Sequence, residues 1–112
     1  MRRVARRLAG FRAVPETFRG IRWNRDNRLW HEKYKRVDPR FSVACKLDWT
    51  RSLKRPDARH TDGRQVSIVS RDVGRRRIVY FVAYVKRNGF LNVMSIRYAE
   101  SDEVEIFHRQ YP

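Results

Sequence analysis

The chain has 112 residues, enough for one small domain with a single modest hydrophobic core. It carries 27 Lys and Arg residues against 12 Asp and Glu residues, a net charge of +15, and this excess favours a polyanionic partner, with nucleic acid as the leading candidate. No run approaches the roughly 20 apolar residues of a membrane span. The single cysteine, Cys45, excludes a disulfide framework and a cysteine-based zinc site, so we expect an intracellular, cytoplasmic protein.

The first half of the chain predicts an extension followed by a strand and two helices. Residues 1–17 are rich in arginine and poor in acids, which suits a flexible basic arm on nucleic acid; organellar transit peptides have a similar composition. Residues 18–23 predict a short strand, and a helix is expected to follow over residues 24–35. The Asp-Pro pair at 38–39 is a helix-start signal, which predicts a second helix that ends near residue 47.

The second half predicts strands and a closing helix. Residues 49–64 are polar and indicate a loop or an edge strand, whereas residues 65–71 alternate enough for a strand. Ser101 can cap a final helix, since acids follow in its first turn, where the helix dipole favours them. The order is a strand, two helices, three or four antiparallel strands and a helix, which predicts a single α+β domain over residues 18–112.

The most informative stretch is the pair of β-rich runs that flank Asn88-Gly89. Both residues readily adopt the positive φ angles of a type I′ turn, so this pair predicts a tight hairpin. With these two residues as the turn, the numbers of cross-strand partners sum to 177, which places Arg97 opposite Tyr80. Side chains alternate along a strand, so one face of the hairpin is expected to be mostly core. The other face is expected to present Tyr80, Val82, Tyr84, Lys86, Leu91, Val93, Ser95 and Arg97 on the sheet surface.

The end of the chain resembles a known sequence pattern. Residues 92–99 read N-V-M-S-I-R-Y-A and are followed by Glu103 and Phe107, which is similar to the closing pattern R-I-I-S-A-R-x-A-x-x-x-E-x-x-x-Y of the BrnT family. The run D-A-R-H at 57–60, followed by Gly63, is similar to the family's D-x-R-H-x-x-G-E segment. The resemblance covers most of the predicted domain.

This resemblance implies a RelE-like fold, in which N-terminal helices and a C-terminal helix pack against an antiparallel β-meander. It also implies the toxin of a type II toxin–antitoxin system, an endoribonuclease that needs no metal or cofactor. The implied partners are RNA and a ribbon-helix-helix antitoxin similar to BrnA, with which the toxin would form a hetero-oligomer. The chain departs from the family at residues 35–37, which read Lys-Arg-Val in place of Lys-His-Gly, and after Gly63, where Arg64 stands in place of an acid.

Three residues are candidates for metal-free RNA cleavage, a reaction that requires proton transfer and cations to stabilise the charge growing on the phosphate. We expect Arg97 to hold the phosphate, His60 to exchange protons near neutral pH, and Lys35 to neutralise phosphate charge. Further RNA contacts, with the tyrosines stacking on bases, are expected from Lys33, Arg59, Arg64, Arg75, Arg76, Arg77, Tyr80, Tyr84 and Lys86. The three histidines lack the spacing of metal ligands, so no metal site is expected.

Two other interpretations of the sequence remain open. The positive charge suits a non-catalytic RNA- or ribosome-binding module equally well, and a structural remnant that binds only a partner protein is a third possibility. At the level of single residues, Arg97 could be a surface residue that pairs with Glu103 or Tyr80, and His60 could be a solvated loop residue.

Overall fold

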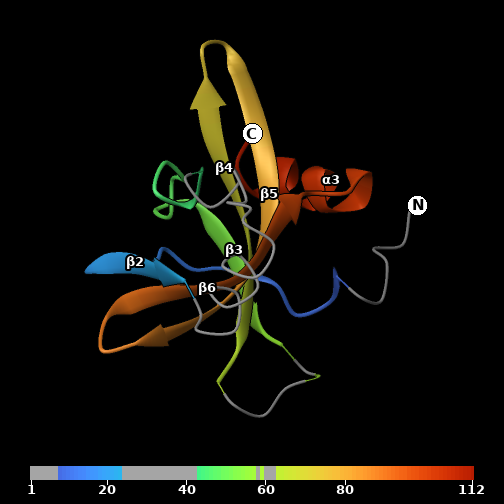
Figure 1. Cartoon of the computed structure of the whole chain (residues 1–112). Helices are drawn as coiled ribbons and strands as arrows, with labels where there is room; N and C mark the ends of the chain where they lie inside the picture. The colour runs from blue at the N-terminus through green and yellow to red at the C-terminus, as the bar shows by residue number, and fades with distance from the viewer. Residues whose placement is uncertain (1–7, 24–42, 58, 60–62) are drawn as a thin grey trace, which may run out of the picture.

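The computed structural model describes residues 8–23, 43–57, 59 and 63–112. In these residues, six strands form one mixed sheet and a helix closes the chain, so the coarse α+β class is confirmed (Figure 1). The elements are β1 (Arg12–Ala13), β2 (Gly20–Trp23), β3 (Ser52–Pro56), β4 (Gln65–Val73), β5 (Arg76–Arg87), β6 (Phe90–Tyr98) and α3 (Ser101–Gln110). Their order across the sheet is β1-β3-β4-β5-β6-β2.

Strands β3 to β6 form an antiparallel meander, as the sequence predicts. On the far side of β6, β2 adds a strand in parallel. The segment expected to be a loop or an edge strand contains β3, which pairs with β4 and leaves the short β1 at the edge. The two helices expected over residues 24–35 and 38–47 lie largely outside the described residues, although Val43 and Ala44, near the end of the second, are helical.

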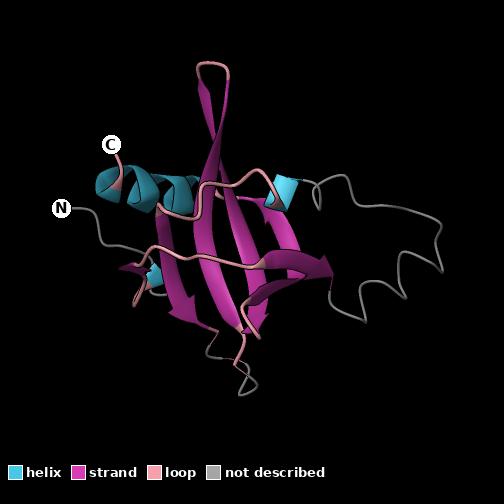
Figure 2. Ribbon diagram, turned by 90° about the vertical axis from the view of Figure 1, so that its left-hand side faces the viewer, coloured by secondary structure: helices cyan, strands magenta, loops and turns pink. Residues whose placement is uncertain are grey.

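The two faces of the sheet are buried by different parts of the chain. One face, which we call the Trp49 face, has a core of Ala44, Leu47, Trp49, Val69, Tyr80, Val82, Tyr84, Leu91, Val93 and Ile96. On the opposite face, which we call the helix face, Phe107 of α3 packs with Leu53, Ile68 and Val79. Figure 2 shows α3 across one end of the sheet, so a large part of the helix face extends beyond this helix.

The closing helix is held to the sheet by its first turn and by Phe107. Its N-cap is Glu100, one residue before the predicted cap at Ser101. Glu100 and Glu103 form a capping box, in which each side chain accepts a hydrogen bond from the backbone N–H of the other. Phe107 is fully buried. No helix in the described part of the chain has the length and apolar character that crossing a membrane requires.

The β5–β6 hairpin turns at Asn88-Gly89, whose φ angles of 54° and 82° confirm the predicted positive-φ turn. The predicted register also holds along the first part of the hairpin, from the turn as far as the pair of Tyr84 and Val93. Local turn chemistry therefore sets the pairing for the four residue pairs nearest the turn: Arg87–Phe90, Lys86–Leu91, Val85–Asn92 and Tyr84–Val93.

A β-bulge then changes the register, because Met94 is an extra residue on β6 between the pairs Tyr84–Val93 and Ala83–Ser95. Arg97 consequently lies opposite Phe81, and the prediction that it faces Tyr80 is wrong. One extra residue reverses the alternation of side chains, so Ser95 and Arg97 lie on the helix face. The tyrosine face that was expected to be open is the buried Trp49 face.

From Leu8 onward, the N-terminal segment is packed on the sheet and is not the flexible extension expected over residues 1–17. Leu8 is buried, and the Glu16 carboxylate is buried beside the amines of Lys54 and Lys86, at 2.7 and 2.9 Å. Burial by itself raises the pKa of Glu16, but the hydrogen bonds and charges of the two lysines outweigh it and hold that pKa below its ordinary value.

Candidate functional site

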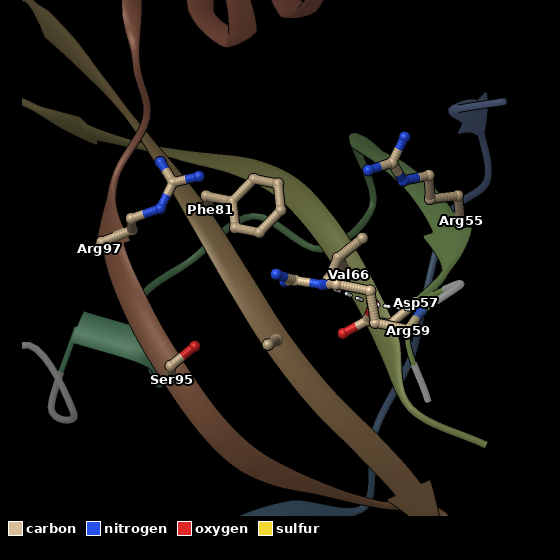
Figure 3. A pocket seen from close by; sticks show the side chains of 8 residues that line it. Arg55, Asp57, Arg59, Val66, Phe81, Ser95 and Arg97 are labelled. Atoms are coloured by element: carbon tan, nitrogen blue, oxygen red, sulfur yellow. Dashed lines mark hydrogen bonds and ion pairs between the residues drawn. The ribbon is translucent and has the colours of Figure 1, made fainter. Parts of the chain in front are cut away.

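The part of the helix face beside α3 contains a cavity of about 500 Å³ (Figure 3). Its lining combines three guanidinium groups with one carboxylate, one hydroxyl and a small apolar surface that includes a phenyl ring. The lining residues are Arg55, Asp57, Arg59, Val66, Phe81, Ala83, Ser95 and Arg97.

The strand register brings these side chains together from four strands. One row of paired residues crosses the sheet as Arg55, Val66, Ala83 and Ser95. The next row crosses it as Leu53, Ile68, Phe81 and Arg97. Paired residues of neighbouring strands project from the same face of the sheet, so the two rows place arginines on either side of a small apolar centre. Asp57 and Arg59 follow β3 and complete the lining.

Arg97 is the most firmly held of the three arginines. Its Nη1 and Nη2 donate to Oε1 and Oε2 of Glu103 at 2.8 and 2.9 Å, and Nη1 also donates to the carbonyl oxygen of Tyr98. The guanidinium carbon lies 4.2 Å from the centre of the Phe81 ring. The Glu103 side chain is 0% exposed and that of Arg97 is 38% exposed. The ion pair with Glu103 that the sequence left open is therefore present, and it fixes the guanidinium over the phenyl ring.

The other two arginines have different contacts. Arg55 Nη1 donates to the carbonyl oxygen of Ala9 at 2.9 Å, and its guanidinium carbon lies 4.5 Å from the centre of the Phe11 ring. Arg59 has a side chain that is 86% exposed, with Nε 3.6 Å from Oδ1 of the nearly buried Asp57. An exposed guanidinium of this kind can reorient toward a ligand at little cost in packing.

Of the predicted site residues, the structure brings Arg97 and Arg59 together in this cavity. His60, Lys33 and Lys35 lie outside the described residues. Arg64 is partly buried beside the cavity, where its carbonyl oxygen accepts a hydrogen bond from the backbone N–H of Asp57, but its side chain is not part of the lining.

Tyr80, Tyr84 and Lys86 lie on the Trp49 face, and the expectation that the two tyrosines lie on an open RNA surface is wrong. Both tyrosines are buried in the core, so neither ring can stack on a base. The Tyr84 hydroxyl hydrogen-bonds the Ser67 hydroxyl at 3.0 Å, and burial raises the pKa of Tyr84 well above its ordinary value. Lys86 donates to Glu16. Trp49 and the apolar residues near it cover this face of the sheet, so its side chains belong to the hydrophobic core.

The three consecutive arginines predicted as an RNA contact lie in the β4–β5 hairpin, which projects from the body of the sheet (Figure 2). Arg75 and Arg76 are exposed at the turn, whereas Arg77 is partly buried and donates to the carbonyl oxygen of Tyr111. None of the three lines the cavity.

Sequence reasoning missed Arg55, Phe81, Ser95 and Asp57. Arg55 falls in a segment left open between loop and strand, and its place opposite Val66 follows only from the long-range pairing of β3 with β4. Phe81 was assigned to the core face of the hairpin, and the bulge that brings Arg97 beside it gives no local signal. Only strand pairing across the whole sheet could have found these neighbours.

Among the described residues, no three His, Cys, Asp or Glu side chains gather as a metal site requires. The chain has no match among protein-family models, curated proteins or solved structures.

Proposed function

We propose that the chain binds RNA at the cavity of the helix face and cleaves its phosphodiester bonds without a metal. The observation that supports this proposal is the convergence of Arg55, Arg59 and Arg97 on one cavity beside the Phe81 ring. Guanidinium groups bind phosphate oxygens through paired hydrogen bonds and stack on bases, which suits RNA better than it suits a small neutral substrate.

The three arginines differ in the role that their surroundings favour. Arg97 is fixed by Glu103, so its guanidinium offers a preorganised positive charge where negative charge grows on the phosphate in the transition state. Arg59 is exposed and can close on an incoming phosphate. His60 follows Arg59 by one residue in the sequence, and the proposal assigns to it the proton transfer that the reaction needs.

The biological role within this proposal is that of a BrnT-like toxin with a RelE-like fold. Support for it comes from the sequence pattern at residues 92–107, together with the antiparallel meander and closing helix. A ribbon-helix-helix antitoxin would then be the partner that neutralises the toxin, and it would do so by covering the cationic cavity or by distorting it.

A second candidate function is RNA binding without catalysis. One observation favours it: the described lining contains no histidine, and its one carboxylate, that of Asp57, is nearly buried beside Arg59. Catalysis therefore depends on His60 or on another residue outside the described part of the chain.

RNA cleavage in EDTA by the wild type, Arg59→Ala and His60→Gln tests both candidates. Arg12→Ala is the matched control, because Arg12 is also exposed but lies on the other face of the sheet. It is opposite Lys54 in the register of β1 and β3, and the Lys54 side chain lies on the Trp49 face beside Glu16. The endoribonuclease proposal expects cleavage in chelator that is lost in the first two variants and kept in the control. RNA that is bound but stays intact supports the second candidate, and a wild type that neither binds nor cleaves RNA overturns both.

A further inference from the structure

The helix face continues beyond the cavity, along the β5–β6 hairpin to its turn. Arg87 and Phe90 are paired across that turn, and Phe90 is in turn opposite Gly20 of β2. Arg22 of β2 is opposite Asn92 in the next row. These residues alternate with Leu91, which is in the core of the Trp49 face, so they lie on the same face as the cavity.

Two arginines of the β2 segment are packed around the Phe90 ring. The guanidinium carbon of Arg22 lies 3.8 Å from the ring centre, and that of Arg19 lies 5.2 Å from it. Arg19 is also tied to the turn, because its backbone N–H donates to the carbonyl oxygen of Gly89 at 2.7 Å. We call Arg19, Arg22, Arg87 and Phe90 the turn cluster.

Glycines make this close packing possible. A Cβ atom at residue 20 would lie 3.0 Å from the Phe90 ring, and one at residue 89 would lie 2.7 Å from the Arg19 side chain. Gly20 thus leaves space for the ring against β2, and Gly89 leaves space for the arginine stem against the turn. The turn cluster is consequently a packed arrangement of cations and a ring, not three independent surface side chains.

The turn cluster gathers three positive charges at one end of the β5–β6 hairpin. In the described part of the chain, no carboxylate forms an ion pair with Arg19, Arg22 or Arg87, although Arg97 and Arg59 each have one. Three guanidinium groups gathered at one end of a hairpin repel one another, and an anionic ligand relieves that repulsion.

We propose that the turn cluster is a second binding site for the same RNA, so that the substrate is a single strand several nucleotides long lying along β6. This inference rests on the proposed function of the cavity. Phe90 and Arg97 are seven residues apart on β6, about 23 Å at roughly 3.3 Å per residue, which is a longer reach than one nucleotide. From the cavity toward the turn, this face carries Ala83 and Ser95 of the cavity lining and then Asn92, and these side chains are small or polar.

A single strand is favoured over a duplex because both ends of this surface combine cations with a phenyl ring. A phenyl ring, or the guanidinium plane that lies over it, can stack only on a base face that is not already covered by a neighbouring base. In an A-form duplex the bases stack on one another, whereas in a single strand they can be splayed out. Phe81 lies beneath Arg97 at the cavity and Phe90 lies beneath Arg22 at the turn.

Binding of fluorescein-labelled oligouridylates of about 3 and 12 nucleotides tests this inference. The variants are Arg22→Ala/Arg87→Ala, the cavity variant Arg59→Ala, and a control of equal charge, Arg12→Ala/Arg51→Ala. Each double variant removes two exposed arginines. Each phosphate contact of a single strand contributes about −0.7 to the slope of log K against log salt, so the loss of two contacts makes this slope less steep by about 1.4. We expect this decrease, with weaker binding at low salt, for the longer strand only and in the turn-cluster variant only.

The outcomes separate the inference from the proposal beneath it. If Arg59→Ala weakens binding of both lengths while the turn-cluster variant binds the longer strand like the wild type, the second site is wrong and the cavity stands. Equal weakening in the control of equal charge also overturns the second site, because it shows a nonspecific effect of net charge. A wild type that binds neither oligonucleotide overturns both.

Discussion

Replacing Arg97 by alanine should destabilise the fold as well as the candidate site, because the same side chain neutralises a buried acid. Its guanidinium donates two hydrogen bonds to Glu103, whose side chain is 0% exposed. Truncating Arg97 leaves that carboxylate without its counter-charge in the first turn of α3. Glu103 still accepts the backbone N–H of Glu100, so the capping contact remains while the charge compensation is lost.

The size of the effect follows from the exposure of the two partners. Removing one member of a fully buried ion pair costs about 3–5 kcal/mol. Arg97 is 38% exposed, so water reaches the carboxylate once the arginine is gone, and we expect a loss of about 2 kcal/mol in the free energy of unfolding. For a domain of this size that loss corresponds to a decrease of about 8 °C in Tm.

A double variant, Arg97→Met/Glu103→Gln, separates stability from function. Methionine keeps an apolar stem over Phe81, and glutamine keeps an oxygen that can accept the Glu100 N–H, so most of the stability should return. Urea unfolding of both variants measures the difference. The argument is refuted if Arg97→Ala costs less than about 0.5 kcal/mol, or if the double variant is as unstable as the single one. RNA cleavage or binding should be lost in both variants if Arg97 holds the phosphate.

Three further predictions concern the scaffold of the site. The pKa of Glu16 is lowered in the folded state, so the stability that its charge contributes is present at neutral pH and is lost as the pH falls through that lowered pKa. Glu16→Gln should therefore flatten the decline in unfolding free energy between pH 7 and about pH 3. An equally steep decline in the variant would contradict this. Gly89→Ala places a side chain at a φ of 82° and should cost about 1–2 kcal/mol by urea unfolding, whereas an unchanged midpoint would show that the turn relaxes freely. Deleting Met94 removes the extra β6 residue of the bulge and leaves Arg97 opposite Phe81 on the helix face, so the variant should keep a cooperative thermal transition near that of the wild type, and loss of that transition would contradict the assigned role of the bulge.

The elements that depend on a local sequence signal could be predicted, whereas the face of the sheet on which Arg97 lies could not. The Asn88-Gly89 pair fixes the hairpin register as far as Tyr84 because turn geometry acts over a few residues. The bulge at Met94 lies in a continuous β-rich run without a glycine or proline to mark it, so the alternation gives no sign that it reverses. Arg97 lines the cavity, but the predicted register placed it on the wrong face.

The choice of the buried face also depends on distant parts of the chain. Both sets of alternating residues on β5 are apolar enough to be core, as in a strand covered on both sides. The covering residues decide between them: Trp49 and its neighbours bury the Tyr84 set, whereas α3 covers only part of the Phe81 set. Pairing between β3 and β4, which brings Arg55 to the cavity, is equally nonlocal.

Glu103 links the end of the fold to the cavity, and this link determines how substitutions should be interpreted. The same carboxylate caps the first turn of α3 and holds Arg97, so the start of the helix is coupled to a residue that lines the cavity. Loss of activity on changing Arg97 alone is therefore ambiguous between a missing contact and a loosened helix. Arg59 contributes to the same cavity with an 86% exposed side chain, and its contact with the Asp57 carboxylate, at 3.6 Å, is longer than that of Arg97 with Glu103, at 2.8 Å. A loss of RNA cleavage in Arg59→Ala with unchanged stability would thus assign function to the cavity without that ambiguity.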